Sequence, residues 1–198
     1  KMSGADAIMP AIAADLDRFY SLTNGSLEPI GLLFSDLAGQ PVPPNMLVQL
    51  LGIPEDQMKA AIEAKQPPVA TKAQLTEAVK RSIDPEDKAD DYKNAFANHI
   101  LRLDNAKQVM EQITPQLTAF HKSVNGSLEK VEAFFCDLAP EPHKGKAMPP
   151  GMINALLRVP PDNKDCTLND FLSCVERNMD PTDKAESFEE ALTKHTAA

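Results

Sequence analysis

The sequence predicts an all-α protein made of two homologous helical modules in tandem, the product of a domain duplication. Each module is expected to hold five to six short helices punctuated by proline. The composition is rich in alanine, leucine, glutamate and lysine and has no tryptophan, which favours helices over strands. The 17 prolines favour short helices with abrupt ends, because proline breaks a helix interior. The third observation is an internal repeat that runs through the chain.

The repeat starts in register at an offset of 101 residues. Asn24-Gly25-Ser26-Leu27-Glu28 returns as Asn125-Gly126-Ser127-Leu128-Glu129, and thirteen of the thirty positions in 9–38 are identical to their partners. A five-residue insertion in the second copy and a later loss of about ten residues change the offset to 96, at which His99 matches His195. The modules are predicted to span residues 1–101 and 102–198. This period is too long for a solenoid repeat.

The first helix of each module is indicated by apolar residues at helical spacing, such as Ile8, Ile12, Leu16 and Phe19. The repeated NGSLE stretch then predicts a joint between helices. Glycine at the left-handed position after a helix carries no steric cost, and serine can cap the next helix by accepting a free N–H. The predicted structural residues of this joint are Gly25, Ser26, Gly126 and Ser127.

The next helices are also marked by proline and by capping residues. Pro44 and Pro150 are expected to begin a short helix, and residues 55–65 an extra helix in the first module. Thr71-x-x-Gln74 and Thr167-x-x-Asp170 predict capping boxes. Asp84 and Asp180, each followed by proline, are predicted N-caps of the last helix. In the first module this helix is expected to continue past His99 and join the second module.

Charge and cysteine content exclude several functional classes. The net charge of −9 is divided almost evenly between the modules, so nucleic-acid binding is not expected. No apolar run approaches the roughly 18 residues of a membrane span. The three cysteines all lie in the second half and are odd in number, which favours a reducing, cytoplasmic compartment.

Catalytic and metal sites are weakly indicated. The Asn-Gly-Ser triplets match the acceptor motif for glycosylation. Their serines could also be nucleophiles, but catalysis would need a histidine and an acid at matching places. Helix capping explains the repeated turn better than either alternative. His99 and His195 form the only histidine pair that recurs, and we expect each to interact with a helix dipole. The cysteines lack the close pair typical of zinc sites, and the acidic stretch 84–91 lacks the pattern of a calcium loop. No metal or cofactor is therefore predicted.

Two sets of residues are candidate binding sites. His143, Lys144 and Lys146 form the only compact basic cluster, just before a predicted helix start, where cations and free N–H groups can meet a phosphate. This arrangement makes an adenine nucleotide, ADP or ATP, the alternative ligand. The proline–methionine pattern at the start of the short helix recurs in both modules. It adds the candidates Pro43, Met46, Met148, Pro149 and Met152.

The stretch Lys146-Ala147-Met148-Pro149, with its weaker counterpart Pro41-Val42-Pro43-Pro44, resembles a family signature. It is similar to the tandem helical modules named KLAMP domains, after a Lys-Leu-Ala-Met-Pro-like motif, in a Legionella effector related to the SidE family. The resemblance implies a type IV-secreted effector that acts in the host cytosol, with a parent protein linked to nucleotide binding. The histidines and glutamates of the SidE-type phosphodiesterase have no matching motif here, so the resemblance carries over no catalytic residue.

The sequence as a whole favours a non-catalytic tandem interaction module with a protein partner. No acid–base or metal constellation is apparent in the repeat, and helix faces commonly recognise other proteins. Nucleotide binding is the alternative function, and a structural spacer without ligand is a third.

Overall fold

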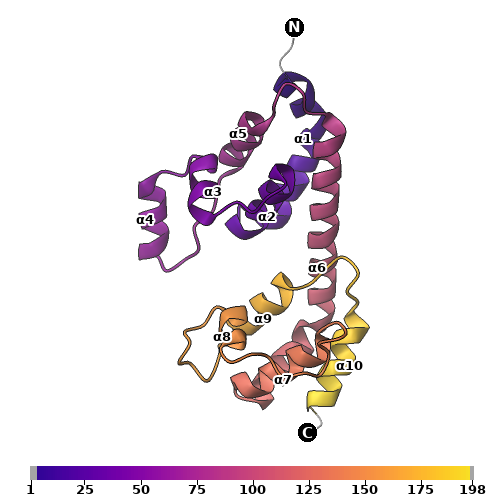
Figure 1. Ribbon diagram of the computed structural model, residues 1–198. Helices are drawn as coiled ribbons and strands as arrows, with labels where there is room; N and C mark the ends of the chain where they lie inside the picture. Colours follow the sequence, from indigo (N-terminus) through magenta and orange to yellow (C-terminus); the bar gives the residue numbers. More distant parts are fainter. Residues whose placement is uncertain (1–3, 197–198) are drawn as a thin grey trace. The chain divides into compact units, whose positions relative to one another are not determined.

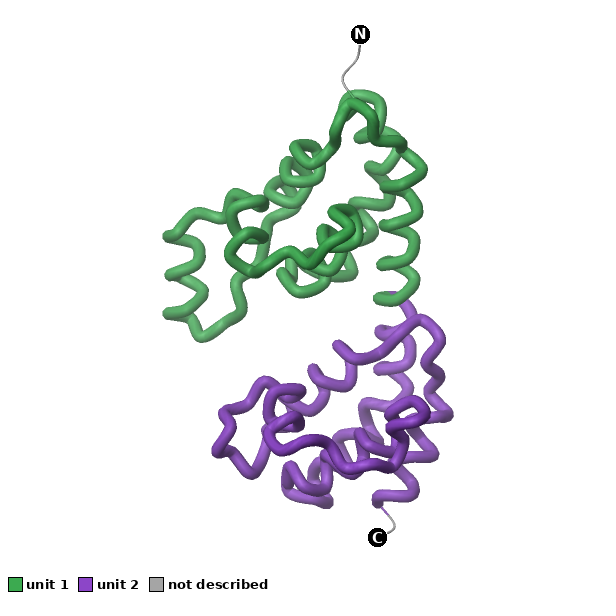
Figure 2. Tube along the Cα trace, viewed as in Figure 1, with its two compact units in different colours: residues 1–103 green, residues 104–198 purple. Residues whose placement is uncertain are grey.

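The computed structural model describes residues 4–196, and this part of the chain is helical, with two isolated β-bridges and no strand (Figure 1). The prediction of an all-α fold is confirmed. The chain forms two compact units, a first that ends at Leu103 and a second that begins at Asp104 (Figure 2). Each unit has its own hydrophobic core.

The first unit packs its helices around two buried phenylalanines. The ring of Phe19 meets the ring of Phe96 edge-on, with the centroids 5.7 Å apart, and both side chains are fully buried. Burial of each such side chain contributes roughly 1.5–3 kcal/mol. The helices are α1 (Gly4–Thr23), α2 (Leu27–Ala38), α3 (Pro44–Leu51), α4 (Glu55–Glu63), α5 (Lys72–Ser82) and the first part of α6 (Ala89–Ser123).

The second unit is built around a cluster of aromatic rings. Phe134 lies against Phe120, Phe135 and Phe171, with ring centroids 5.2–5.8 Å apart. The helices of this unit are the rest of α6, α7 (Leu128–Leu138), α8 (Met152–Leu157), α9 (Leu168–Arg177) and α10 (Ala185–Thr196). The prediction of one long helix across residue 101 is confirmed, because α6 is continuous from Ala89 to Ser123.

The NGSLE stretch is a joint between helices, as predicted. Asn24 and Gly25 follow α1 with φ of 49° and 81°, and the Gly25 carbonyl accepts a 2.8 Å hydrogen bond from the Ala70 amide. The serine prediction was wrong in one respect. Ser26 and Ser127 occupy the N-cap positions of α2 and α7, but neither side chain makes a capping hydrogen bond. Their backbones instead form the two β-bridges, which orient these helix starts.

Both predicted capping boxes are confirmed. The Thr71 hydroxyl accepts from the Gln74 amide at 3.1 Å, and the Thr71 amide donates to Gln74 Oε1 at 2.9 Å. Thr167 and Asp170 make the same pair of bonds at the start of α9. The extra helix predicted for residues 55–65 is α4, which buries none of its side chains.

Three predictions about helix starts and prolines need correction. Asp84 and Asp180 are not N-caps, since α6 and α10 begin five residues later. The Asp84 amide donates to Asp87 Oδ2 at 2.8 Å, and the Asp180 amide donates to Asp183 Oδ2 at 2.9 Å, so each stretch forms a turn. Helix α8 starts at Met152 rather than Pro150, because Gly151 adopts a left-handed φ of 80°. Proline does not end every helix, for α6 contains Pro115.

Candidate functional site

The first unit contains a buried histidine paired with a carboxylate. His99 on α6 donates from Nε2 to Asp36 Oδ2 on the last turn of α2, at 2.7 Å. The His99 residue is only 9% exposed, and its Nδ1 atom is buried with no hydrogen-bond partner among residues 4–196. This pair links two helices and leaves no ring nitrogen free to act as an exposed general base.

The second unit contains the same pair of residue types. His195 on α10 donates from Nε2 to Asp137 Oδ2 on α7, and Lys194 Nζ lies 3.2 Å from the same oxygen. The hydrogen bond from His195, joined by the attraction of Lys194, lowers the pKa of Asp137. The edge of the Phe134 ring packs against the imidazole. The carboxylate therefore remains ionised at neutral pH and holds α7 to α10.

A hollow of about 570 Å³ lies beside the pair in the first unit. On α2, Leu32, Ser35 and Asp36 line it, and their spacing of three and four residues places them on one helix face. His99 and Arg102, three residues apart, line it from α6. The remaining lining residues are Gln40 and Pro41.

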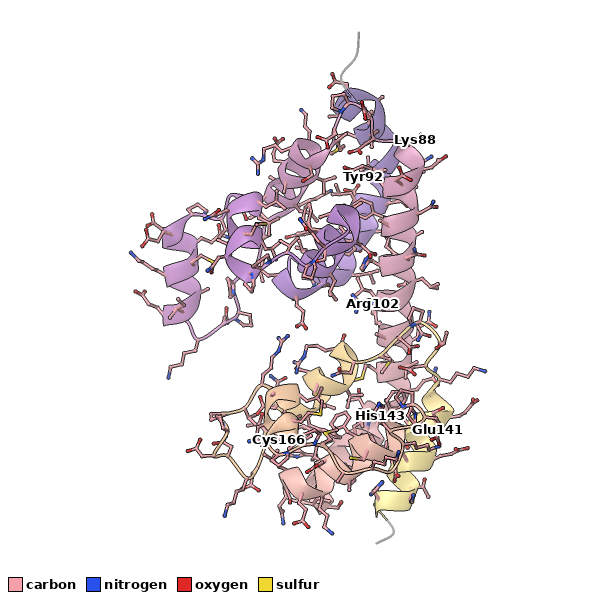
Figure 3. All side chains as sticks on the ribbon, in the orientation of Figure 1. Lys88, Tyr92, Arg102, Glu141, His143 and Cys166 are labelled. Carbon is pink, nitrogen blue, oxygen red and sulfur yellow. The ribbon has the colours of Figure 1, made fainter. Side chains whose placement is uncertain are left out.

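Arg102 is the cation of this hollow (Figure 3). Its Nη2 nitrogen is buried, and the described part of the chain provides no hydrogen-bond partner for it. Burial lowers the pKa of the Arg102 guanidinium, and this effect exceeds the opposing attraction of Glu28 and Asp36. The guanidinium still carries its charge, and its Nη2 atom is enclosed by the protein.

A smaller hollow, of about 390 Å³, lies beside the pair in the second unit. It is richer in carboxylates, since Glu129 and Glu132 join Asp137, and Lys194 is the lysine that lines it. The segment after α7 closes one side, where the Gly145 amide donates to the Cys136 carbonyl at 2.8 Å. The full lining is Glu129, Glu132, Ala133, Cys136, Asp137, Gly145, Ala147, Lys194 and His195.

The predicted basic cluster lies next to this second hollow but not inside it. His143, Lys144 and Lys146 are exposed, while Gly145 and Ala147 between and after them line the hollow (Figure 3 labels His143). The backbone amides of this region are largely used within the chain. Those of His143, Gly145, Lys146, Met148 and Met152 donate to oxygens of the protein.

The predicted proline–methionine residues do not line either hollow. Met46 on α3 and Met152 on α8 are 56% and 51% exposed, so each short helix presents a methionine to solvent. Pro43 is the N-cap of α3, Pro149 lies in the turn before α8, and Met148 packs against the core of the second unit.

The thiols are not activated. Burial raises the pKa of Cys166 and of Cys174 to about 11, and it also raises that of Cys136. All three cysteines are therefore protonated at neutral pH. Within residues 4–196, no group of three histidine, cysteine, aspartate or glutamate side chains is placed to hold a metal ion. None of the described helices combines the length and apolarity needed to cross a membrane.

The histidine–aspartate pairs are the feature that sequence reasoning missed. The expectation that His99 interacts with a helix terminus was wrong, because His99 lies in the interior of the 35-residue helix α6 and pairs with Asp36. A signal was present in the sequence. Both members of the pair recur, Asp36 as Asp137 and His99 as His195, and a joint recurrence of acid and base indicates a contact.

No protein-family model matches the chain, and neither curated proteins nor solved structures show significant similarity to it. Its function is therefore argued from its own residues.

Proposed function

We propose that the two units descend from one duplicated helical module. Long-range contacts at corresponding positions support this origin. Tyr20 donates from its hydroxyl to the Ala70 carbonyl, and His121 donates from Nε2 to the Cys166 carbonyl at the corresponding place. The guanidinium of Arg81 donates to the Leu50 carbonyl, and that of Arg177 donates to the Leu156 carbonyl. The Ala70 amide donates to the Gly25 carbonyl, as the Cys166 amide does to the Gly126 carbonyl. Both capping boxes also lie at corresponding positions.

The function that the geometry supports best is a non-catalytic interaction module in which each unit receives a segment of a protein partner at its hollow. One observation carries this proposal. In both units a helix with aspartate in its last turn lies beside a helix that bears histidine, and the pair borders a hollow. In each pair the histidine is tied to its aspartate, and the thiols are protonated, which argues against acid–base or thiol chemistry. Two sites on one chain provide avidity for a bivalent partner.

The setting of this function follows the resemblance to tandem modules of a secreted effector, which supports action in the host cytosol. The buried, reduced cysteines are compatible with that reducing compartment.

Substitutions at the two hollows test the interaction proposal. Leu32 and Ala133 occupy corresponding lining positions and are exposed, so Leu32→Arg with Ala133→Arg fills both hollows without disturbing either core. The matched control is Ile62→Arg with Leu101→Arg, which adds the same charge at exposed sites outside the hollows. Each immobilised protein is incubated with host-cell lysate, and captured proteins are quantified by mass spectrometry.

We expect the wild type and the control to capture the same specific proteins. The amount captured by the double hollow variant should be at least about tenfold lower. Equal capture by all three proteins would refute the interaction function at these sites.

Nucleotide binding stays the second candidate, favoured by the proximity of the basic segment to Lys194 at the second hollow. The carboxylates of that hollow and the engaged backbone amides oppose it, because a polyphosphate needs free donors and positive charge. Titration of isotope-labelled protein with ADP and ATP tests whether the chain binds a nucleotide. Saturable amide shifts in residues 143–152 that Lys144→Ala with Lys146→Ala removes would establish this function in place of the first.

A further inference from the structure

The hollow of the second unit has a lining with an excess of negative charge. Helices α7 and α10 pack side by side along it (Figure 1), and α7 contributes the carboxylates of Glu129, Glu132 and Asp137. At most two cations face these carboxylates from the lining, Lys194 and, when protonated, His195. The excess remains in either charge state of the imidazole, so the hollow attracts a cation and repels an anion.

Two of these carboxylates are available to a new cation. Within residues 4–196, no lysine, arginine or histidine makes an ion pair with Glu129 or Glu132. Glu129 is exposed, and Glu132 Oε1 accepts a 3.2 Å hydrogen bond from the Met148 amide, which holds the side chain at the hollow. A cation that enters the hollow therefore meets acceptors without breaking an existing ion pair.

Lys194 supplies a cation to this hollow from within the chain. Its Nζ atom lies 3.2 Å from Asp137 Oδ2, although the lysine side chain is 70% exposed. An exposed ion pair of this kind is weak, because solvent screens it and the long side chain loses freedom in it. Lys194 can therefore move aside for a partner's cation, with which it competes for the same negative charge.

The Cys136 thiol, in the wall of the hollow, senses the same charge. Burial is the main cause that raises the pKa of Cys136, and the charges of Glu132 and Asp137 raise it further. The wall also has an apolar part, formed by Ala133 and Ala147, which suits the methylene stem of a long basic side chain.

We propose that the second-unit hollow binds an arginine side chain of a protein partner, with Glu129 and Glu132 as its ligands. The proposal rests on the interaction function and names the chemistry that one unit recognises. A guanidinium presents its donors in a planar fork that matches carboxylates, which a lysine ammonium does not. The hollow of about 390 Å³ is many times the roughly 30 Å³ that one water molecule occupies, so it has room for one such side chain.

The first-unit hollow is an internal control. Its lining has one carboxylate, Asp36, and one guanidinium, Arg102, and Gly31 is the residue that corresponds to Glu132. We therefore expect the arginine side chain to bind the second unit and not the first.

The test titrates the full, isotope-labelled chain with short capped peptides and follows the amide signals. The probes are N-acetyl-Ala-Arg-Ala-amide, the same peptide with neutral citrulline in place of arginine, and guanidinium chloride, each up to about 20 mM, which nearly saturates a site of millimolar Kd. We expect the arginine peptide to shift the amides of residues 129–137 saturably, with a Kd at least about threefold below that of the citrulline peptide. This preference should shrink when the salt concentration rises from about 0.05 to 0.5 M.

Equal Kd values for the two peptides, shifts confined to the first unit, or no saturable shift would overturn the inference. Guanidinium chloride that binds as tightly as the arginine peptide would also overturn it, because the hollow would then take a free cation rather than a partner's side chain.

Two variants with opposite expected effects connect the binding to the named residues. Glu132→Gln removes a negative charge but keeps an acceptor for the Met148 amide, and it should weaken the arginine peptide at least about threefold. Lys194→Gln removes the competing cation and should strengthen the arginine peptide about twofold or more. The matched control is Lys130→Gln, an exposed lysine of α7 outside the lining, which changes the net charge equally and should leave the Kd within about 1.5-fold.

If Glu132→Gln fails to fold, Glu129→Gln decides in its place, because Glu129 is exposed. An unchanged Kd in the folded glutamate variant, or equal effects of Lys194→Gln and Lys130→Gln, would refute the inference. Such a result would leave the interaction function intact if the double hollow variant still loses its captured proteins. If capture is also unchanged, both proposals fail.

Discussion

Substitution of Gly25 by alanine tests the joint between α1 and α2 most directly. A Cβ atom at Gly25 would lie 2.0 Å from the Ala70 carbonyl oxygen, which is backbone and cannot swing aside. The turn must therefore open, and the 2.8 Å bond from the Ala70 amide to the Gly25 carbonyl is lost. Loss of that bond costs about 0.5–1.5 kcal/mol, and alanine at a left-handed φ costs a further 1–2 kcal/mol or so. We expect Gly25→Ala to lower the free energy of unfolding by about 1.5–3.5 kcal/mol.

Gly39→Ala is the matched control for this prediction. Gly39 also has a left-handed φ, of 71°, but nothing lies within 4 Å of the added Cβ. Only the backbone cost remains, so the control should lose about 1–2 kcal/mol. The comparison separates the close contact at Ala70 from the conformational preference of glycine.

Tyrosine fluorescence during urea unfolding measures this difference in the first unit alone. The chain has two tyrosines, Tyr20 and Tyr92, both in that unit, and no tryptophan. With a urea dependence of roughly 1.5 kcal/mol/M, the midpoint should fall by about 1–2.3 M for Gly25→Ala and by about 0.7–1.3 M for the control, the larger fall being that of Gly25→Ala. Equal midpoint shifts for the two variants would refute the argument that the Ala70 contact requires glycine.

Three further predictions concern the second unit and the caps. Because the pKa of Asp137 is lowered in the folded state, its stabilisation is present above the ordinary value near 3.8 and is lost as the pH falls through the lowered pKa. Asp137→Asn should therefore reduce amide-exchange protection in α10 near neutral pH. The difference in protection from the wild type should shrink towards pH 3 or so. A difference that does not change with pH would contradict a stabilising role of the Asp137 charge. Thr71→Ala should cost the first unit about 1 kcal/mol by loss of the capping box, as a lower urea midpoint, whereas Thr71→Ser should retain most of that stability. Cys166 and Cys174 are buried and have pKa values of about 11, so they should resist iodoacetamide near pH 8 in the native protein and react after unfolding. Mass spectrometry measures the labelling. Rapid labelling of the native protein would show that these thiols are accessible.

Local features of the fold could be predicted from sequence because each depends on residues close together in the chain. The capping box at Thr71 needs a residue three positions away, and the turn at Gly25 needs only a left-handed glycine after a helix. The same local reasoning failed at Asp84. An aspartate before a proline suits both an N-cap and a turn, and the Asp87 carboxylate, which accepts from the Asp84 amide, selects the turn.

The candidate site could not be predicted in the same way because its residues are far apart in sequence. His99 and Asp36 are separated by 63 positions, and only the packing of α6 against α2 brings them together. The unpartnered Nη2 atom of Arg102 has no sequence signature, since its burial depends on the side chains that surround it. The basic segment at Lys144 was recognised by composition, but composition did not reveal that its neighbouring amides are already engaged.

The length of one segment explains why the two hollows differ. The connection between α7 and α8 is longer than that between α2 and α3, and a Cβ added at its Gly145 would lie 4.0 Å from the Asp137 carboxylate. This segment and Lys194 cover the aspartate, whose side chain is 17% exposed, whereas that of Asp36 is 59% exposed. The hollow shrinks accordingly from about 570 to about 390 Å³. The longer connection thus closes the second hollow around the ion pair of Asp137 and Lys194. At the first hollow Asp36 stays exposed, and the shorter connection leaves the hollow more accessible to a segment of a partner.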